Sequence, residues 1–162
     1  MQFSTEHYYR AACERMIDAR ELHKRARYGF CLYASGLAVE SMLRAFRWKR
    51  DPLFDARHDL DRLFKDSGIL QLNEEKLRSR GLADEIVRRT ITEFLAAKED
   101  VTRYWSNDFR FGSESQIRGY LVALQLYRGK RGDLLKVSAS TILTAAQIMV
   151  DTGVMLRTSK KK

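Results

Sequence analysis

The sequence predicts an all-α protein, arranged as an up-and-down helical bundle of four to five main helices with one or two short ones. Its 162 residues contain a single proline, Pro52, and long helices exclude proline because it lacks an amide donor and clashes with the preceding turn. Apolar side chains recur at three- and four-residue steps along most of the chain, which is the helical period. The composition, 44% hydrophobic and 31% charged, is typical of a globular protein. We expect one domain over residues 1–157 and a disordered basic tail over residues 158–162.

The net charge of +9 and the sequence pI of about 9.8 favour an acidic partner such as nucleic acid. Cys13 and Cys31 form no Cys-x-x-Cys pair, so we expect free thiols in a reducing cytoplasm. The N-terminus has no apolar signal-peptide segment, and no apolar run approaches the roughly 20 residues that cross a bilayer. These features predict a cytoplasmic location without membrane contact.

The first half of the chain predicts two long helices. The first is expected over residues 5–27, with Ser4 as its N-cap and a break at Gly29. The second, residues 30–46, is apolar almost all round, as the central helix of a bundle is. Within it, Gly36 predicts a close approach of another element, and Glu40 requires a hydrogen-bonding or cationic partner.

A turn at Asp51-Pro52 precedes a short helix that we expect to begin at Asp55 and to end at Gly68. A further short helix is expected over residues 73–80, and a long amphipathic one over residues 83–104.

Residues 105–113 interrupt the helical period and predict a loop. The spacing of Ser113 and Gln116 forms a capping box, which predicts a helix from Glu114 to about Tyr127. Asp133 is the expected cap of the last helix, residues 134–156.

A polar cluster in the predicted loop is the first candidate site. Two guanidiniums beside aromatic faces can grip phosphates and stack bases. The alternative is an ordered connection in which the aromatic rings anchor the loop in the core and the polar groups serve the turn. The polar residues of this cluster are Arg103, Asn107, Asp108 and Arg110.

His58 and Glu40 form the second candidate site. His58 opens a short helix and can act as a general base, or it can donate a hydrogen bond to Glu40 as a structural pair. For Glu40 we expect His58, Arg103 or Arg110 as the partner. His7 and His23 are expected at helix edges, without a functional role.

The string YASGLAVESMLRAF (residues 33–46), followed by ARHDLDRL (residues 56–63), resembles the central helix pair of HEPN domains. The segments YWSNDFRF (residues 104–111) and ILTAAQIMVDTG (residues 142–153) are similar to parts of small stand-alone members. This resemblance implies a helical bundle that dimerises. It also implies a relation to RNA, since active members are metal-independent ribonucleases of toxin–antitoxin or antiviral systems. Those enzymes carry an arginine followed after four to six residues by a histidine.

This sequence departs from that motif, because Arg103 is followed, after four residues, by Asp108 in the place of the histidine. We therefore expect a homodimeric binding module for RNA, a nucleotide or a partner protein of a bacterial defence or toxin–antitoxin system, with no metal or cofactor. Its binding residues are then Glu40, Arg103, Asn107 and Arg110. The alternative is a divergent metal-independent endoribonuclease with catalytic candidates His58, Arg103, Asp108 and Arg110. A third hypothesis for the function is a scaffold that binds no ligand.

Overall fold

The computed structural model describes residues 3–54, 58–126, 128–129 and 131–158. Within these ranges the chain forms seven α-helices and one 3₁₀ turn, with no strand. The predicted all-α bundle is confirmed. The elements are α1 Thr5–Lys24, α2 Tyr28–Arg50, α3 Leu60–Ser67, α4 Ile69–Ser79, α5 Asp84–Tyr104, η1 Asn107–Arg110, α6 Glu114–Ala123 and α7 Leu134–Thr158.

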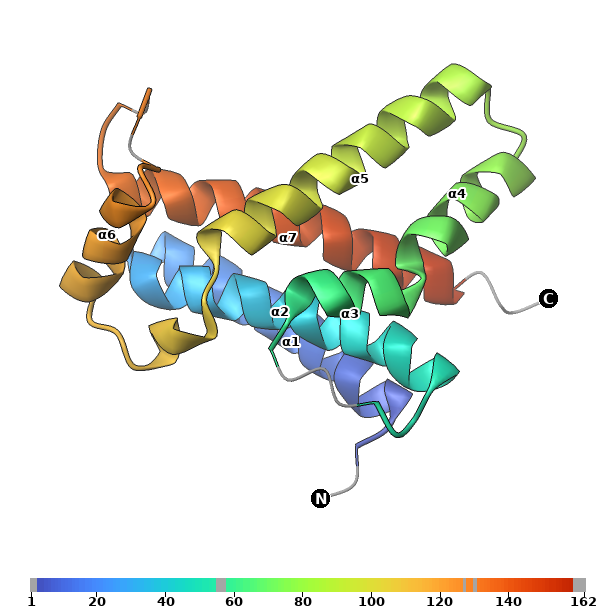
Figure 1. Ribbon diagram of the computed structural model, residues 1–162, viewed down its shortest axis with the longest axis horizontal. Coiled ribbons are helices and arrows are strands. Elements are labelled where there is room, and N and C mark those ends of the chain that lie inside the picture. The colour runs from blue at the N-terminus through green and yellow to red at the C-terminus, as the bar shows by residue number, and fades with distance from the viewer. Residues whose placement is uncertain (1–2, 55–57, 127, 130, 159–162) are drawn as a thin grey trace.

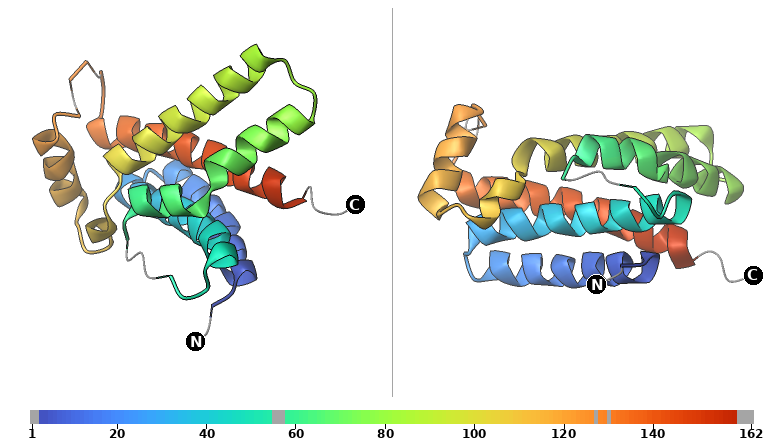
Figure 2. Two further views of the ribbon diagram at one scale, coloured as in Figure 1. Left: turned by 45° about the vertical axis from the view of Figure 1, so that its right-hand side comes forward. Right: turned by 60° about the horizontal axis from the view of Figure 1, so that its bottom comes forward.

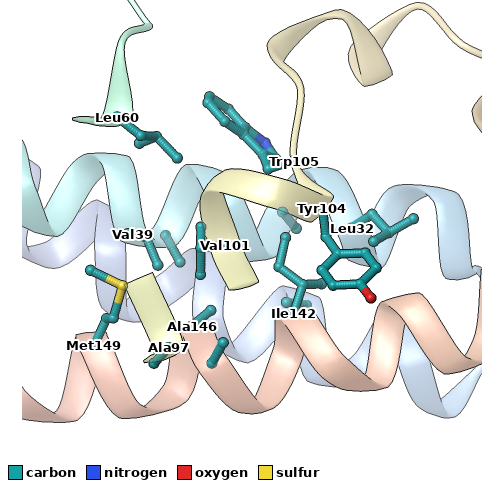
Figure 3. Packing of buried hydrophobic residues seen from close by; sticks show 14 of the residues in the cluster. Leu32, Val39, Leu60, Ala97, Val101, Tyr104, Trp105, Ile142, Ala146 and Met149 are labelled. Carbon is teal, nitrogen blue, oxygen red and sulfur yellow. The ribbon is translucent and has the colours of Figure 1, made fainter. Parts of the chain in front are cut away.

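Helix α2 is the centre of the bundle and packs against α1, α7, α3 and α5 (Figure 1). Figure 2 shows α1 on one side of α2 and α7, and α3, α4 and α5 on the other, with α6 standing across one end. The buried apolar residues form one cluster to which every helix contributes. Their packing around α2, α5 and α7 is shown in Figure 3. The burial of α2 on nearly all sides was predicted from its apolar sequence.

The turn between α1 and α2 lies at Ala26, three residues before the break that was expected at Gly29. Ser4 caps α1 as predicted, but α1 ends at Lys24, and the chain reverses at Ala26, which has a φ of 55°. Two hydrogen bonds close this turn, from the Arg27 amide to the Leu22 carbonyl (2.9 Å) and from the Ala26 amide to the His23 carbonyl (3.0 Å). This is a Schellman motif, with alanine in the left-handed position that glycine usually takes.

Gly29, where the break was expected, lies inside α2. A Cβ atom at this position would lie 3.0 Å from Cδ1 of Ile117. The missing side chain at Gly29 therefore accommodates the close approach of α6, and the turn prediction at Gly29 was wrong.

Between α2 and α5, helix α3 begins later in the sequence than expected, and helix α4 begins earlier. Asp55, the expected cap, lies outside the described residues, and α3 is capped by Asp59, whose carboxylate accepts from the Arg62 amide (2.9 Å). Gly68 ends α3 as predicted, with a φ of 67°. Helix α4 follows at once from Ile69, not from Asn73, because Ile69 is fully buried and anchors its first turn in the core.

The C-terminal helices largely follow the sequence pattern. Helix α5 has the predicted extent to within one residue, and the capping box of Ser113 and Gln116 begins α6. Helix α6 ends at Ala123, four residues before the expected end, because Gln125 adopts a left-handed φ of 57°. Asp133 caps α7 as predicted, since its carboxylate accepts from the amides of Leu135 (2.8 Å) and Lys136 (3.2 Å). Helix α7 reaches Thr158, and residues 159–162 of the expected tail lie outside the described residues.

Helix α7 bears on the expectation that no apolar run approaches the length needed to cross a bilayer. Its 25 residues are long and apolar enough to cross a bilayer, judged by length and composition alone. In the bundle, 44% of its most apolar stretch is buried, against α2, α5 and α1. A helix in the core of a protein meets the same two criteria.

Candidate functional site

Glu40 lies in the middle of α2, with only 4% of its surface exposed. Its carboxylate accepts a hydrogen bond from Nε of Arg44, one helical turn further on (2.7 Å). Nδ1 of His58 lies 3.0 and 3.1 Å from the two carboxylate oxygens. Two partners on one side chain satisfy a buried charge that would otherwise be costly.

Of the three partners expected for Glu40, the structure has His58 and neither Arg103 nor Arg110. Arg44 was missed by the sequence interpretation. Its signal was present, because a glutamate four residues before an arginine is a favourable helical pair.

The orientation of His58 follows from its partner. A carboxylate only accepts, so Nδ1 of His58 donates its proton to Glu40. Nε2 makes no hydrogen bond within the described part of the chain. The ring is half-exposed, with 44% of the side chain accessible, so Nε2 is the atom of His58 that is left for a ligand.

His58 forms part of a pocket of about 340 Å³ between the start of α3, the end of α5, η1 and α6. We call it the His58 pocket. It is lined by His58, Asp59, Leu60, Thr102, Trp105, Ser106, Asn107 and Tyr120.

Trp105 forms the inner wall of this pocket and is itself nearly buried. Its indole N–H donates to the carbonyl of Tyr33 (3.2 Å), and its ring lies where a side chain at Gly36 would stand. Figure 3 shows the ring pointing toward Leu60, away from Tyr104. The close approach predicted at Gly36 is therefore made by the first residue after α5. This packing holds the aromatic wall in a fixed position.

Asn107 and Tyr120 contribute polar and aromatic surface to the pocket. The side-chain carbonyl oxygen of Asn107 is buried and has no hydrogen-bond partner among the described residues. Buried acceptors without a partner are rare in proteins. Tyr120 is 42% exposed, and its ring is held edge-on against Phe109 (5.3 Å between centroids).

The other predicted site residues lie outside the His58 pocket. Asp108 is exposed on η1. The guanidinium of Arg110 lies over the ring of Phe111, 4.5 Å from its centroid. Arg103 lines a different pocket, on α5 and the turn after α6. The structure thus brings together Glu40, His58 and Asn107, and it does not bring Arg103, Asp108 or Arg110 to them.

His7 and His23 both make structural contacts. His7 accepts from the Ser4 amide at the start of α1 (3.1 Å). Nε2 of His23 lies 2.8 Å from the hydroxyl of Ser140 on α7. That hydroxyl donates its hydrogen to the Lys136 carbonyl (2.9 Å), so it accepts from His23. This serine–histidine contact therefore joins α1 to α7 and does not activate a nucleophile.

Two further observations bear on chemistry elsewhere in the fold. Among the described residues, no group of three or more histidine, cysteine or acidic side chains is placed to hold a metal ion. Cys13 and Cys31 are both free thiols. Burial raises the pKa of the Cys31 thiol to about 11, which keeps it protonated and unreactive at neutral pH.

Comparison with known proteins finds no match for this chain: no family model, no curated protein and no solved structure matches it.

Proposed function

We propose that this protein is an RNA-binding module that holds a nucleotide of a single-stranded RNA in the His58 pocket. The observation that carries the proposal is the make-up of this pocket. It combines a half-exposed imidazole held by a buried carboxylate, an unpaired amide oxygen and an exposed aromatic ring. Sequence-specific recognition of RNA uses these groups on unstacked bases.

Each side chain has a distinct part in this binding. The exposed ring of Tyr120 stacks on a base. Asn107 accepts a hydrogen bond from an exocyclic amino group of that base. Nε2 of His58 contacts the ribose or its phosphate, and Glu40 keeps the imidazole in the required orientation. The net charge of +9 supports a polyanionic ligand, since it favours association with phosphates.

The resemblance to HEPN domains supports the same ligand class and adds a biological setting. By that resemblance we propose a cytoplasmic homodimer that works in a bacterial defence or toxin–antitoxin system. A free nucleotide or a partner protein is the alternative ligand within this proposal.

The binding proposal is tested by titrating a labelled single-stranded RNA against the protein and following fluorescence anisotropy. Tyr120→Ala should weaken binding by roughly tenfold, the worth of one stacked base. Phe30→Ala is a matched control, because Phe30 is similarly exposed (45%) but lies at the start of α2. Equal affinity of Tyr120→Ala and the wild type would exclude the His58 pocket as the base site.

The hydrogen bond between Glu40 and His58 favours a second candidate function, metal-independent ribonuclease activity. A carboxylate that orients a histidine leaves Nε2 free to accept the proton of the ribose 2′-hydroxyl. Such a site would act without Arg103, Asp108 and Arg110, which do not line the pocket.

The enzymatic alternative is tested by incubating RNA with the protein in the presence of a chelator. His58→Asn retains an N–H group for Glu40 and removes Nε2, so cleavage by the wild type and not by this variant would support catalysis. Intact RNA after incubation with pure wild-type protein, under conditions in which the RNA is bound, would leave binding as the function.

A further inference from the structure

A second pocket, of about 290 Å³, lies between the end of α5 and the turn that follows α6. Figures 1 and 2 show this turn beside the C-terminal end of α5. No residue lines both this pocket and the His58 pocket. It is lined by Arg103, Tyr104, Leu124, Gln125, Leu126 and Arg128.

The charges of this second pocket are unbalanced. Two of its residues, Arg103 and Arg128, are cationic, and no acidic residue lines it. Neither arginine forms an ion pair within the described ranges, whereas Arg118 of the neighbouring helix α6 pairs with Asp133 (3.1 Å). Two guanidiniums facing one pocket without a carboxylate create a positive potential that an anion would relieve.

The walls of the pocket suit a small, hydrated anion. Tyr104 and Leu126 are both about 4% exposed and form a packed floor. The Arg128 amide donates to the carbonyl of Gln125 (3.3 Å), which holds these two exposed residues within one turn. Gln125 and Arg128 both line the pocket, and the side chain of each carries hydrogen-bond donors.

We propose that this second pocket is a binding site for a phosphate group, held by Arg103 and Arg128. Guanidinium groups bind phosphate oxygens through paired, charge-assisted hydrogen bonds. The phosphate is either that of a free phosphate ester or one of the RNA backbone, and both present the same oxygens to the two arginines. The site does not depend on base binding in the His58 pocket.

The experiment measures binding of inorganic phosphate, adenosine 5′-monophosphate and adenosine by NMR titration, for the wild type and for Arg103→Gln/Arg128→Gln. The wild type should bind phosphate and the monophosphate, and the double variant should bind both at least roughly tenfold more weakly. Arg88→Gln/Arg89→Gln is the control for net charge, since it also removes two positive charges, from exposed positions on the same helix, α5, and it should bind as the wild type does. A melting temperature equal to that of the wild type verifies the fold of each variant.

A parallel titration with single-stranded RNA distinguishes the two sources of the phosphate. RNA binding by Arg103→Gln/Arg128→Gln that is weaker than RNA binding by Arg88→Gln/Arg89→Gln would assign the site to the RNA backbone. Unchanged RNA binding with lost phosphate binding would assign it to free phosphate esters. Tyr120→Ala should bind inorganic phosphate normally, which separates this test from that of the base site. Phosphate binding that is absent in the wild type, or equal in the double variant, would overturn the proposal.

Discussion

The indole ring of Trp105 occupies the space beside Gly36 where any other residue would place its Cβ atom. This contact joins the core to the candidate site, because Gly36 lies in the central helix α2 and Trp105 forms a wall of the His58 pocket. The same indole donates to the Tyr33 carbonyl, one turn before Gly36. The position of the pocket wall is therefore fixed by the packing of α2.

Gly36→Ala should lower the free energy of unfolding by about 3 kcal/mol, since the added methyl group overlaps the Trp105 ring. Chemical denaturation measures the change. In a Trp105→Ala background the same substitution should cost little or nothing, because the ring is absent and alanine favours the helix. Equal costs in the two backgrounds would contradict the contact.

Ala26→Gly should raise the free energy of unfolding by about 0.5–1 kcal/mol. Ala26 has a φ of 55°, and a left-handed backbone is strained for alanine and not for glycine. Part of this gain is offset by the greater freedom of glycine in the unfolded chain. Ala96→Gly, at an exposed position inside α5, should instead lower stability by about 1 kcal/mol. A loss of stability at both positions would show that the Ala26 turn is not strained.

Arg44→Met should lower the free energy of unfolding by about 3 kcal/mol, because it leaves the buried Glu40 carboxylate with His58 alone. The double variant Glu40→Met/Arg44→Met should recover most of that loss, since it removes the uncompensated charge. Urea denaturation of the wild type, both single variants and the double variant measures the coupling. Additive losses would mean that the two side chains do not act as a pair.

Because of Cys31, the free energy of unfolding should decrease as the pH rises through the alkaline range. Burial raises the pKa of its thiol from 9.0 to about 11, so the folded state keeps a proton that the unfolded state loses. Stability from this group is complete below pH 9 and falls progressively from about pH 9 to pH 11. The loss between these values should be smaller in Cys31→Ala than in the wild type, whatever the effect of the substitution at pH 7.

Thiol labelling tests the burial of Cys31 independently of its pKa. At pH 8 the partly exposed Cys13 should react with a thiol reagent well before Cys31 does. Equal rates at the two cysteines would contradict the burial of Cys31.

The sequence predicted the helices well because the apolar period, the capping residues and the single proline all act locally. Ser4, Gly68, Ser113 and Asp133 each mark a helix boundary in the structure as in the sequence. The errors arose where tertiary packing decides the outcome. The sequence predicts a turn at Gly29, but the missing side chain of this residue accommodates Ile117 of α6.

The candidate site was predictable only in part, for the same reason. Glu40 required a partner because it lies in an apolar helix, and His58 was among the three expected. Arg103, Asp108 and Arg110 were grouped with one another by proximity in the sequence, and no local pattern indicates whether they reach Glu40 and His58. The end of α5 directs Trp105 into the His58 pocket and Arg103 into the other, so residues two positions apart belong to different sites.

The central claim, that RNA binds at the His58 pocket, is tested most directly by photo-crosslinking. A single-stranded RNA containing 4-thiouridine is bound to the wild-type protein and irradiated, and the crosslinked peptides are identified by mass spectrometry. We expect crosslinks at Tyr120 or Trp105, the two aromatic residues of the pocket. Crosslinks confined to α1 or α4, which do not line it, would contradict the claim.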